Sequence, residues 1–236
     1  MEPTTAAQPR AQMQQVVINQ FIRSVYNWMA AGLAITGFIA YYTSTSQTLL
    51  NLVFGNSILF FGLIIGELAL VFFLSSRIAK IQASTATGLF IFYAALNGIT
   101  LSFVFLVYTS SSVASTFFIC ATTFGVSSIY GMVTKRDLTS AGQFMVMGLI
   151  GIVIASVVNM FVRSSGMSMI ISYIGVIVFV GLTAYDTQKL KTMALSQPHG
   201  LDKGVVRKGA IMGALSLYLD FINLFLMLLR ILGNRE

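Results

Sequence analysis

Long apolar stretches recur along the chain, separated by short polar segments. A run of about 20 apolar residues is the length at which an α-helix crosses the hydrocarbon core of a bilayer. The pattern therefore predicts an all-α membrane protein with seven transmembrane helices. We expect the spans near Tyr26–Tyr42, Ser57–Ser75, Thr85–Tyr108, Val113–Val133, Gln143–Phe161, Ser168–Tyr185 and Gly209–Leu232.

Composition agrees with this pattern. Of the 236 residues, 56% are hydrophobic and 9% are charged, whereas soluble domains average roughly 25% charged residues. We expect one domain, a seven-helix membrane unit over residues 21–236. The polar residues 1–20 are expected to form a flexible tail without a fold of its own.

The basic residues are distributed unevenly between the two sides of the membrane that the spans define. Eleven cations fall on the side of the N-terminus and the even-numbered loops, against three on the other side, which are Arg163, Arg230 and Arg235. Cytoplasmic loops carry an excess of lysine and arginine. This bias predicts a cytoplasmic N-terminus and an external C-terminus. It also explains the net charge of +7 without nucleic-acid binding.

Few residues offer metal or redox chemistry. Cys120 and His199 are the single cysteine and the single histidine, which excludes an intrachain disulfide and a Cys/His metal cluster. Cys120 is predicted to be a small packing residue, and His199 a solvated loop residue. We expect no cofactor.

Acidic residues inside the spans are the strongest functional signal. Asp220 lies near the middle of the last span, where a carboxyl group is costly and usually functional. Spacings of three and four residues place it on one helix face with other small or polar residues. Those residues are Gly209, Gly213, Ser216 and Asn223. We expect this stripe to face inward and the opposite apolar face to contact lipid.

Asp186, near the cytoplasmic end of the sixth span, is the predicted partner of Asp220. The two spans run antiparallel, and Cα–Cβ bonds in a helix tilt toward its N-terminus, so the two carboxyl groups lean toward each other. Adjacent carboxylates tend to share a proton, and a divalent cation such as calcium can replace that proton. This predicts a pH-sensitive gate at Asp186 and Asp220. The alternative is a static, hydrogen-bonded clamp.

Two further charged residues are candidates for accessory roles. Glu67 in the second span could be a third carboxylate in the same cavity, or it could bond a local hydroxyl such as that of Tyr93. Arg77 could pair with Asp186 in a closed state, or act as an interfacial anchor. Ser216 and Asn223 are possible accessory residues, and Asn97 and Asn159 are expected to hydrogen-bond between helices.

Several motifs resemble one known family. The segments "AYDTQKLK" and "LSLYLDFINLFLMLLRILG" are similar to the end of the Bax inhibitor-1 family, also called the transmembrane Bax inhibitor motif family. "TKRDLTS" and "GITLSFVFLVYTSSSVASTFF" are similar to its bacterial members, and the resemblance covers about Phe21 to Asn234. It implies a central helix surrounded by six others in a bacterial inner membrane.

The resemblance also implies a function. It implies a pH-sensitive calcium leak that is gated by two aspartates. Asp186 and Asp220 match the positions of those aspartates, and Arg77 lies in the region of the family's arginine latch. The expected partners are the lipid bilayer, calcium and protons. Bacterial members have also been linked to membrane proteases.

Three other functions compete with a calcium leak. The protein could be an interaction partner that modulates a membrane protease or stress response. A proton-coupled transporter is less favoured, because no span contains proline. An intramembrane aspartyl protease also places two aspartates on adjacent helices, but its Gly-x-Gly pattern before the second aspartate is replaced here by Leu-Tyr-Leu. We therefore expect no enzyme activity.

Overall fold

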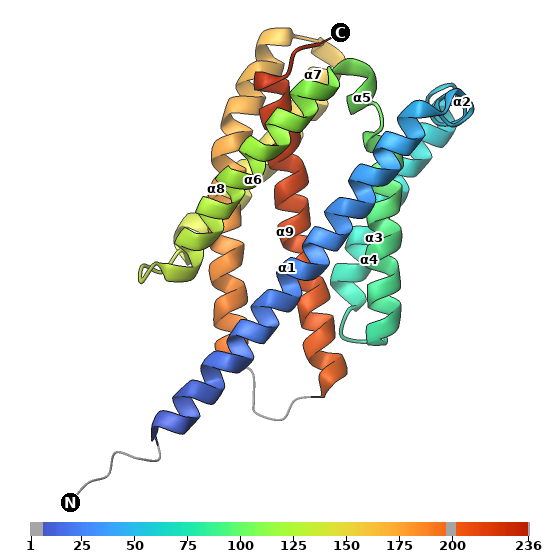
Figure 1. The fold of residues 1–236 in the computed structure, drawn as a ribbon. Helices are drawn as coiled ribbons and strands as arrows, with labels where there is room; N and C mark the ends of the chain where they lie inside the picture. Colours follow the sequence, from blue (N-terminus) through green and yellow to red (C-terminus); the bar gives the residue numbers. More distant parts are fainter. Residues whose placement is uncertain (1–6, 197–201, 236) are drawn as a thin grey trace, which may run out of the picture.

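The computed structural model describes residues 7–196 and 202–235, with side chains from Ile18 onward. Residues 1–6, His199 and Glu236 lie outside the described part. The described residues form nine helices around one long axis (Figure 1). They are α1 (Ala7–Thr45), α2 (Gln47–Phe54), α3 (Ser57–Arg77), α4 (Ala83–Leu101), α5 (Val104–Val107), α6 (Ser110–Val133), α7 (Thr139–Val162), α8 (Ser165–Ser196) and α9 (Lys203–Leu232).

Six helical segments are long and apolar enough to cross a membrane. They correspond to the second through seventh spans expected from the sequence, with α4 and α5 counted together as Ala83–Val107. The first expected span lies within α1. This helix is not among the six, because tyrosine, threonine, glycine and Asn27 dilute its apolar stretch.

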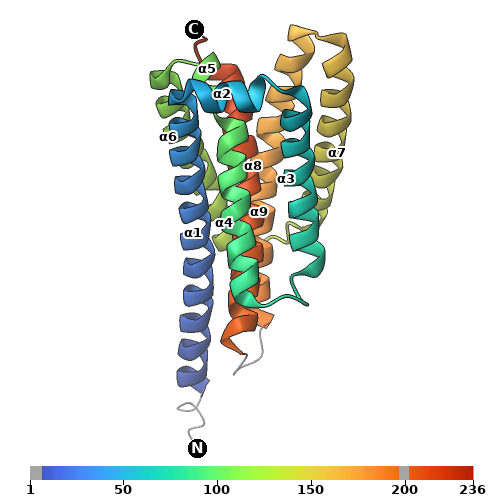
Figure 2. The ribbon, with the colours of Figure 1, turned by 90° about the vertical axis from the view of Figure 1, so that its right-hand side faces the viewer.

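Helix α1 begins earlier than the sequence analysis expects. It is helical from Ala7, so residues 7–20 continue the first span, whereas a tail without a fold of its own was predicted there. Glutamine, alanine and methionine in this segment are good helix formers, although the segment as a whole is polar. Figures 1 and 2 show this end of α1 projecting beyond the other helices.

Helix α9 forms the centre of the bundle (Figure 2). In its most apolar 18-residue stretch, 67% of the residues are buried, compared with 6% in the corresponding stretches of α3 and α7. It packs against α8, α1, α6 and α4, while α3 packs mainly on α4 and α7 on α8. Four helices therefore enclose α9 directly and two lie outside them, which corrects the expectation of six helices around the centre.

The central position of α9 also corrects the prediction that one apolar face of this helix contacts lipid. Ile211, Tyr218 and Leu229 are almost completely buried, although they lie on the face opposite the small polar stripe. Apolar side chains suit lipid and a protein interior equally well. Their pattern therefore could not distinguish a central helix from a peripheral one.

Polar residues mark where several helices begin. The Asn56 side chain accepts hydrogen bonds from the backbone of Ile58 and Leu59 at the start of α3. Before α7, Asp137 Oδ1 accepts from Oγ1 and N of Thr139, at 2.6 and 2.9 Å. These two bonds, the side-chain one foremost, hold the pKa of Asp137 below its ordinary value.

A glycine permits the close crossing of α6 and α8 beside Asp186. A Cβ atom at Gly131 would collide with the backbone of Ala184, two residues before Asp186. Because the colliding atoms belong to the backbone of α8 and cannot rotate away, a side chain at this position would force α6 and α8 apart. The position of Asp186 therefore depends on the absence of a side chain at Gly131.

We predict that Gly131→Ala destabilises the protein by about 1–3 kcal/mol, the usual cost of overpacking. Gly125→Ala in the same helix is the matched control, because a Cβ there has no neighbour within 4 Å and alanine favours the helix. Thermal unfolding in detergent measures both variants. Equal midpoints for the two would contradict the close crossing.

Candidate functional site

Asp220 is buried in the centre of the bundle. Its exposed fraction is 6%, and its Oδ2 atom has no hydrogen-bond partner among the described residues. A buried polar atom normally has a partner, and leaving it without one costs about 1–3 kcal/mol. This arrangement is the most costly polar feature of the described core and therefore the first candidate for function.

Asp186 lies on α8, half-buried, facing the same region. The two carboxyl groups are close enough to interact electrostatically. Lys189, one turn further along α8, is the cation that acts on Asp186. The structure thus brings together the two acids that the sequence analysis paired, with a cation on the outer side of the pair.

The small stripe of α9 lies along α8, as the spacing predicted. A Cβ at Gly209 would contact Met193 of α8, and one at Gly213 would contact Leu190. The contact on α8 shifts from Met193 to Leu190 as the position on α9 shifts from Gly209 to Gly213, so the two helices are antiparallel. Asp220 therefore reaches the level of Asp186. The glycines of the stripe thus lie against α8, and also against Phe21 and Val25 of α1. The stripe is not the most buried face of α9, because Gly209, Ser216 and Asn223 stay partly exposed.

The other two stripe residues make a smaller contribution. Ser216 is half-buried. Asn223 is also half-buried, and its Nδ2 donates to the backbone oxygen of Leu219 at 2.8 Å. Asn223 therefore bonds its own helix, and no printed contact joins it to either aspartate.

Hydroxyl groups surround the residue that follows Asp186. Thr187 Oγ1 lies 3.5 Å from Ser128 Oγ of α6 and 3.4 Å from the Tyr26 hydroxyl of α1. Thr187 is fully buried. The sequence analysis missed these hydroxyls, because they come from three helices and share no sequence motif.

Glu67 belongs to a different polar cluster. Its Oε1 accepts from Thr100 Oγ1 at 2.8 Å, and its Oε2 accepts from Asn97 Nδ2 at 3.3 Å. No group of three His, Cys, Asp or Glu residues that could hold a metal occurs in the described part. Of the two alternatives for Glu67, the third carboxylate of the aspartate cavity is therefore not the one that the structure shows. Glu67 bonds local polar groups instead, although its hydroxyl partner is Thr100 and not Tyr93.

The Glu67 cluster continues into the centre of the bundle. The Tyr218 hydroxyl donates to Asn97 Oδ1 at 3.2 Å and lies 2.7 Å from Thr36 Oγ1. Tyr218 also packs edge-on against Phe90 and Tyr93. Side chains of α3, α4, α9 and α1 are thereby joined in one hydrogen-bonded network, and Asn97 has the interhelical role that was expected.

Other predicted residues stay apart from the aspartates. Arg77 is exposed at the end of α3, which packs on α4 and not on α8, so the structure does not bring Arg77 and Asp186 together. Asn159 donates to Ser168 at 2.7 Å, joining α7 to α8. Cys120 is buried, and its thiol faces the backbone oxygen of Phe221 at 3.6 Å, as expected of a packing residue.

Comparison with known proteins identifies the family. The model of the family described as "Inhibitor of apoptosis-promoting Bax1" matches residues 18–236, and the chain belongs to this family. It is 53% identical to the inner membrane protein YbhL of Escherichia coli K12 over 229 residues, which cover 97% of this chain and 95% of YbhL. The chain is thus a multi-pass helical membrane protein of the Bax inhibitor family.

Relatives in distant bacteria show similar coverage. An uncharacterized protein of Borreliella burgdorferi is 46% identical over 94% of this chain and 96% of its own length. Protein RP147 of Rickettsia prowazekii, also uncharacterized, is 47% identical over 93% of this chain and 91% of its own. The similarity therefore extends over nearly the whole chain.

We predict that Tyr218→Phe destabilises the protein by about 1–3 kcal/mol, because Thr36 and Asn97 lose a buried partner. The ring and its packing are retained, so the loss isolates the hydroxyl group. Tyr173→Phe is the control, since Tyr173 is exposed on α8. If thermal unfolding midpoints of the two variants coincide, the network does not anchor α9.

Proposed function

We propose that this protein is a pH-sensitive calcium leak channel of a bacterial inner membrane, gated by Asp186 and Asp220. The observation that carries the proposal is the buried carboxyl group of Asp220, with one oxygen unpartnered and Asp186 as its electrostatic neighbour. Family membership supports a helical membrane protein, and the name of the E. coli relative supports the inner membrane as its location.

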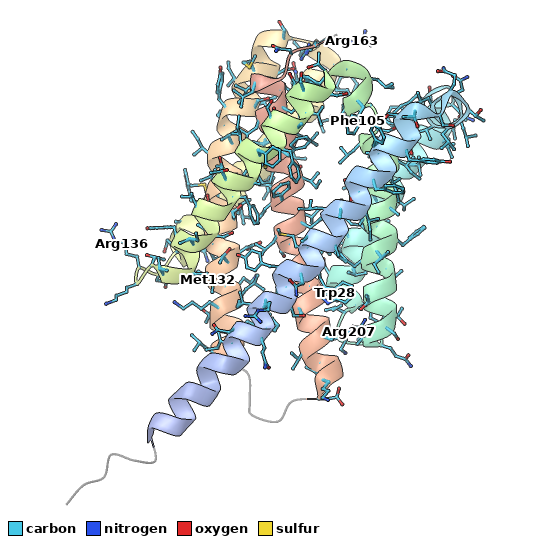
Figure 3. The ribbon with its side chains drawn as sticks, viewed as in Figure 1. Trp28, Phe105, Met132, Arg136, Arg163 and Arg207 are labelled. Carbon is cyan, nitrogen blue, oxygen red and sulfur yellow. The ribbon has the colours of Figure 1, made fainter. Side chains whose placement is uncertain are left out.

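The proposed orientation is seven spans with the N-terminus in the cytoplasm and the C-terminus outside. The eleven-to-three charge bias supports it. In Figure 3, Arg136 and Arg207 lie toward the N-terminal end of the bundle and Arg163 lies at the opposite end. In this orientation the aspartate pair opens toward the cytoplasm, and α1 is the seventh membrane helix.

The gate operates through repulsion between like charges. At acid pH a proton shared by the two carboxyl groups lets α8 and α9 pack closely. When that proton leaves, two negative charges repel each other in a poorly hydrated site. The small residues Gly209 and Gly213 leave α9 free to shift along α8. The described arrangement, with Asp220 buried, corresponds to the closed state.

Calcium enters this scheme as the transported ion. Two carboxyl groups and nearby hydroxyl oxygens are the hard ligands that calcium prefers. Calcium usually takes six to eight oxygens, and the described residues offer no third acid beside the pair. The site therefore suits brief binding of an ion in transit better than permanent occupancy.

We predict that Asp186→Asn and Asp220→Asn each remove most of the pH dependence of calcium leak, because an amide cannot exchange the shared proton. Calcium influx into liposomes containing the purified protein, followed across a pH series, measures this. The wild type should leak more at alkaline than at acid pH.

Asp137→Asn is the matched control. Asp137 is an exposed acid at the same end of the bundle, joined to α8 through the bond from Leu138 N to Gln188 Oε1. Its variant should keep the wild-type pH profile. Wild-type profiles in both pair variants would overturn the proposed gate.

A further inference from the structure

The three basic residues of the sparsely charged end converge on one cavity. Arg163, at the turn between α7 and α8, Arg230, in the last turn of α9, and Arg235, just after it, all line a cavity of about 530 Å³. These are the same three cations that the charge pattern assigns to the external side. External segments are normally depleted of lysine and arginine, so their convergence at one place requires a reason.

The lining of this cavity suits an anion. Among the described residues it contains no aspartate or glutamate, and Asn159 and three serines add polar groups. Arg163 comes from the turn between α7 and α8, whereas Arg230 and Arg235 both come from the end of α9 and the residues just after it, and no acid among the described residues lies in the lining. A guanidinium group matches the geometry of a phosphate with paired N–H donors. A phosphate is therefore the complementary ligand.

Hydrogen bonds of neighbouring residues hold the segments that carry two of the three arginines. Arg235 lies over the ring of Tyr108 at 5.8 Å, and the adjacent Asn234 bonds Ser112 and Thr109 at the start of α6. Asn159 caps the turn that carries Arg163, with its Oδ1 accepting from Ser164 N at 3.0 Å. The backbone on two sides of the cavity is thus held in place by these bonds.

The surroundings of the cavity indicate a lipid as the source of the phosphate. Met160, Phe161 and Ile170 next to the arginines are 58%, 77% and 60% exposed, which provides an apolar bed for acyl chains. Figure 3 places Arg163 at the end of the bundle opposite the N-terminus, which is the part of a membrane-spanning bundle that headgroups can reach. We propose that this arginine pocket binds the headgroup phosphate of an anionic phospholipid such as phosphatidylglycerol in the outer leaflet.

Tryptophan quenching by brominated lipids tests this site independently of ion leak. Trp28, the only tryptophan, lies near Arg207, far from the pocket (Figure 3). A Trp28→Phe, Ile170→Trp protein places the probe beside the pocket. In liposomes, brominated phosphatidylglycerol should quench this probe more strongly than phosphatidylcholine with the same brominated chains.

Removing the three arginines should abolish the stronger quenching by brominated phosphatidylglycerol. Each basic residue near a membrane surface contributes about fivefold in anionic lipid binding. We choose Arg163→Asn, with Arg230→Gln and Arg235→Gln, because Arg163 has a left-handed backbone (φ 55°) that asparagine tolerates. Arg230→Gln alone should give a partial loss, which provides a test if the triple variant does not fold.

The matched control removes three exposed cations from the opposite end, Lys80, Lys135 and Arg136, and should leave the preference unchanged. Equal quenching by both lipids in the wild-type pocket would overturn the proposal, as would a preference that survives the triple arginine variant. Loss of the preference in millimolar inorganic phosphate, but not in chloride of equal ionic strength, would assign the pocket to a soluble anion and overturn the lipid.

Discussion

The buried carboxyl group of Asp220 is the constraint on which the rest of the structure depends. An acid at the centre of a membrane bundle is tolerated only where a proton, a cation or a hydrogen-bond donor can balance it. Here the described residues leave one of its oxygens without a partner, and the nearest electrostatic neighbour is a second acid. The helices around α9 therefore enclose an acid that a proton or a cation must balance.

The central helix is held differently on its two sides. Tyr218 and Asp220 are two residues apart, which is about 200° around a helix with 3.6 residues per turn. The Tyr218 side is anchored to α1 and α4 by a hydroxyl network that ends at Glu67. The Asp220 side faces α8 across small residues. We infer that α9 moves with α1 and α4 and that α8 is the helix that parts from it.

Particular residues explain how far the sequence could predict this structure. Apolar length predicted the membrane helices, and the three- and four-residue spacing around Asp220 predicted its face toward α8. The central position of α9 was missed because the apolar residues opposite Asp220, such as Ile211 and Leu229, would suit lipid equally well. The Tyr218 network was missed because its partner Thr36 lies 182 positions away. Short-range patterns carry no information about such a contact.

The distance between α8 and α9 tests the gate most directly. Thr192 and Val205 are exposed on these two helices and can carry spin labels in a Cys120→Ser background. Pulsed electron paramagnetic resonance in liposomes then measures the distance between the labels. The account predicts a distance that widens from acid to alkaline pH, with calcium shifting the midpoint, and a constant distance in the Asp220→Asn protein. A wild-type distance that stays constant across the pH series, with and without calcium, would contradict the gate and favour a static clamp.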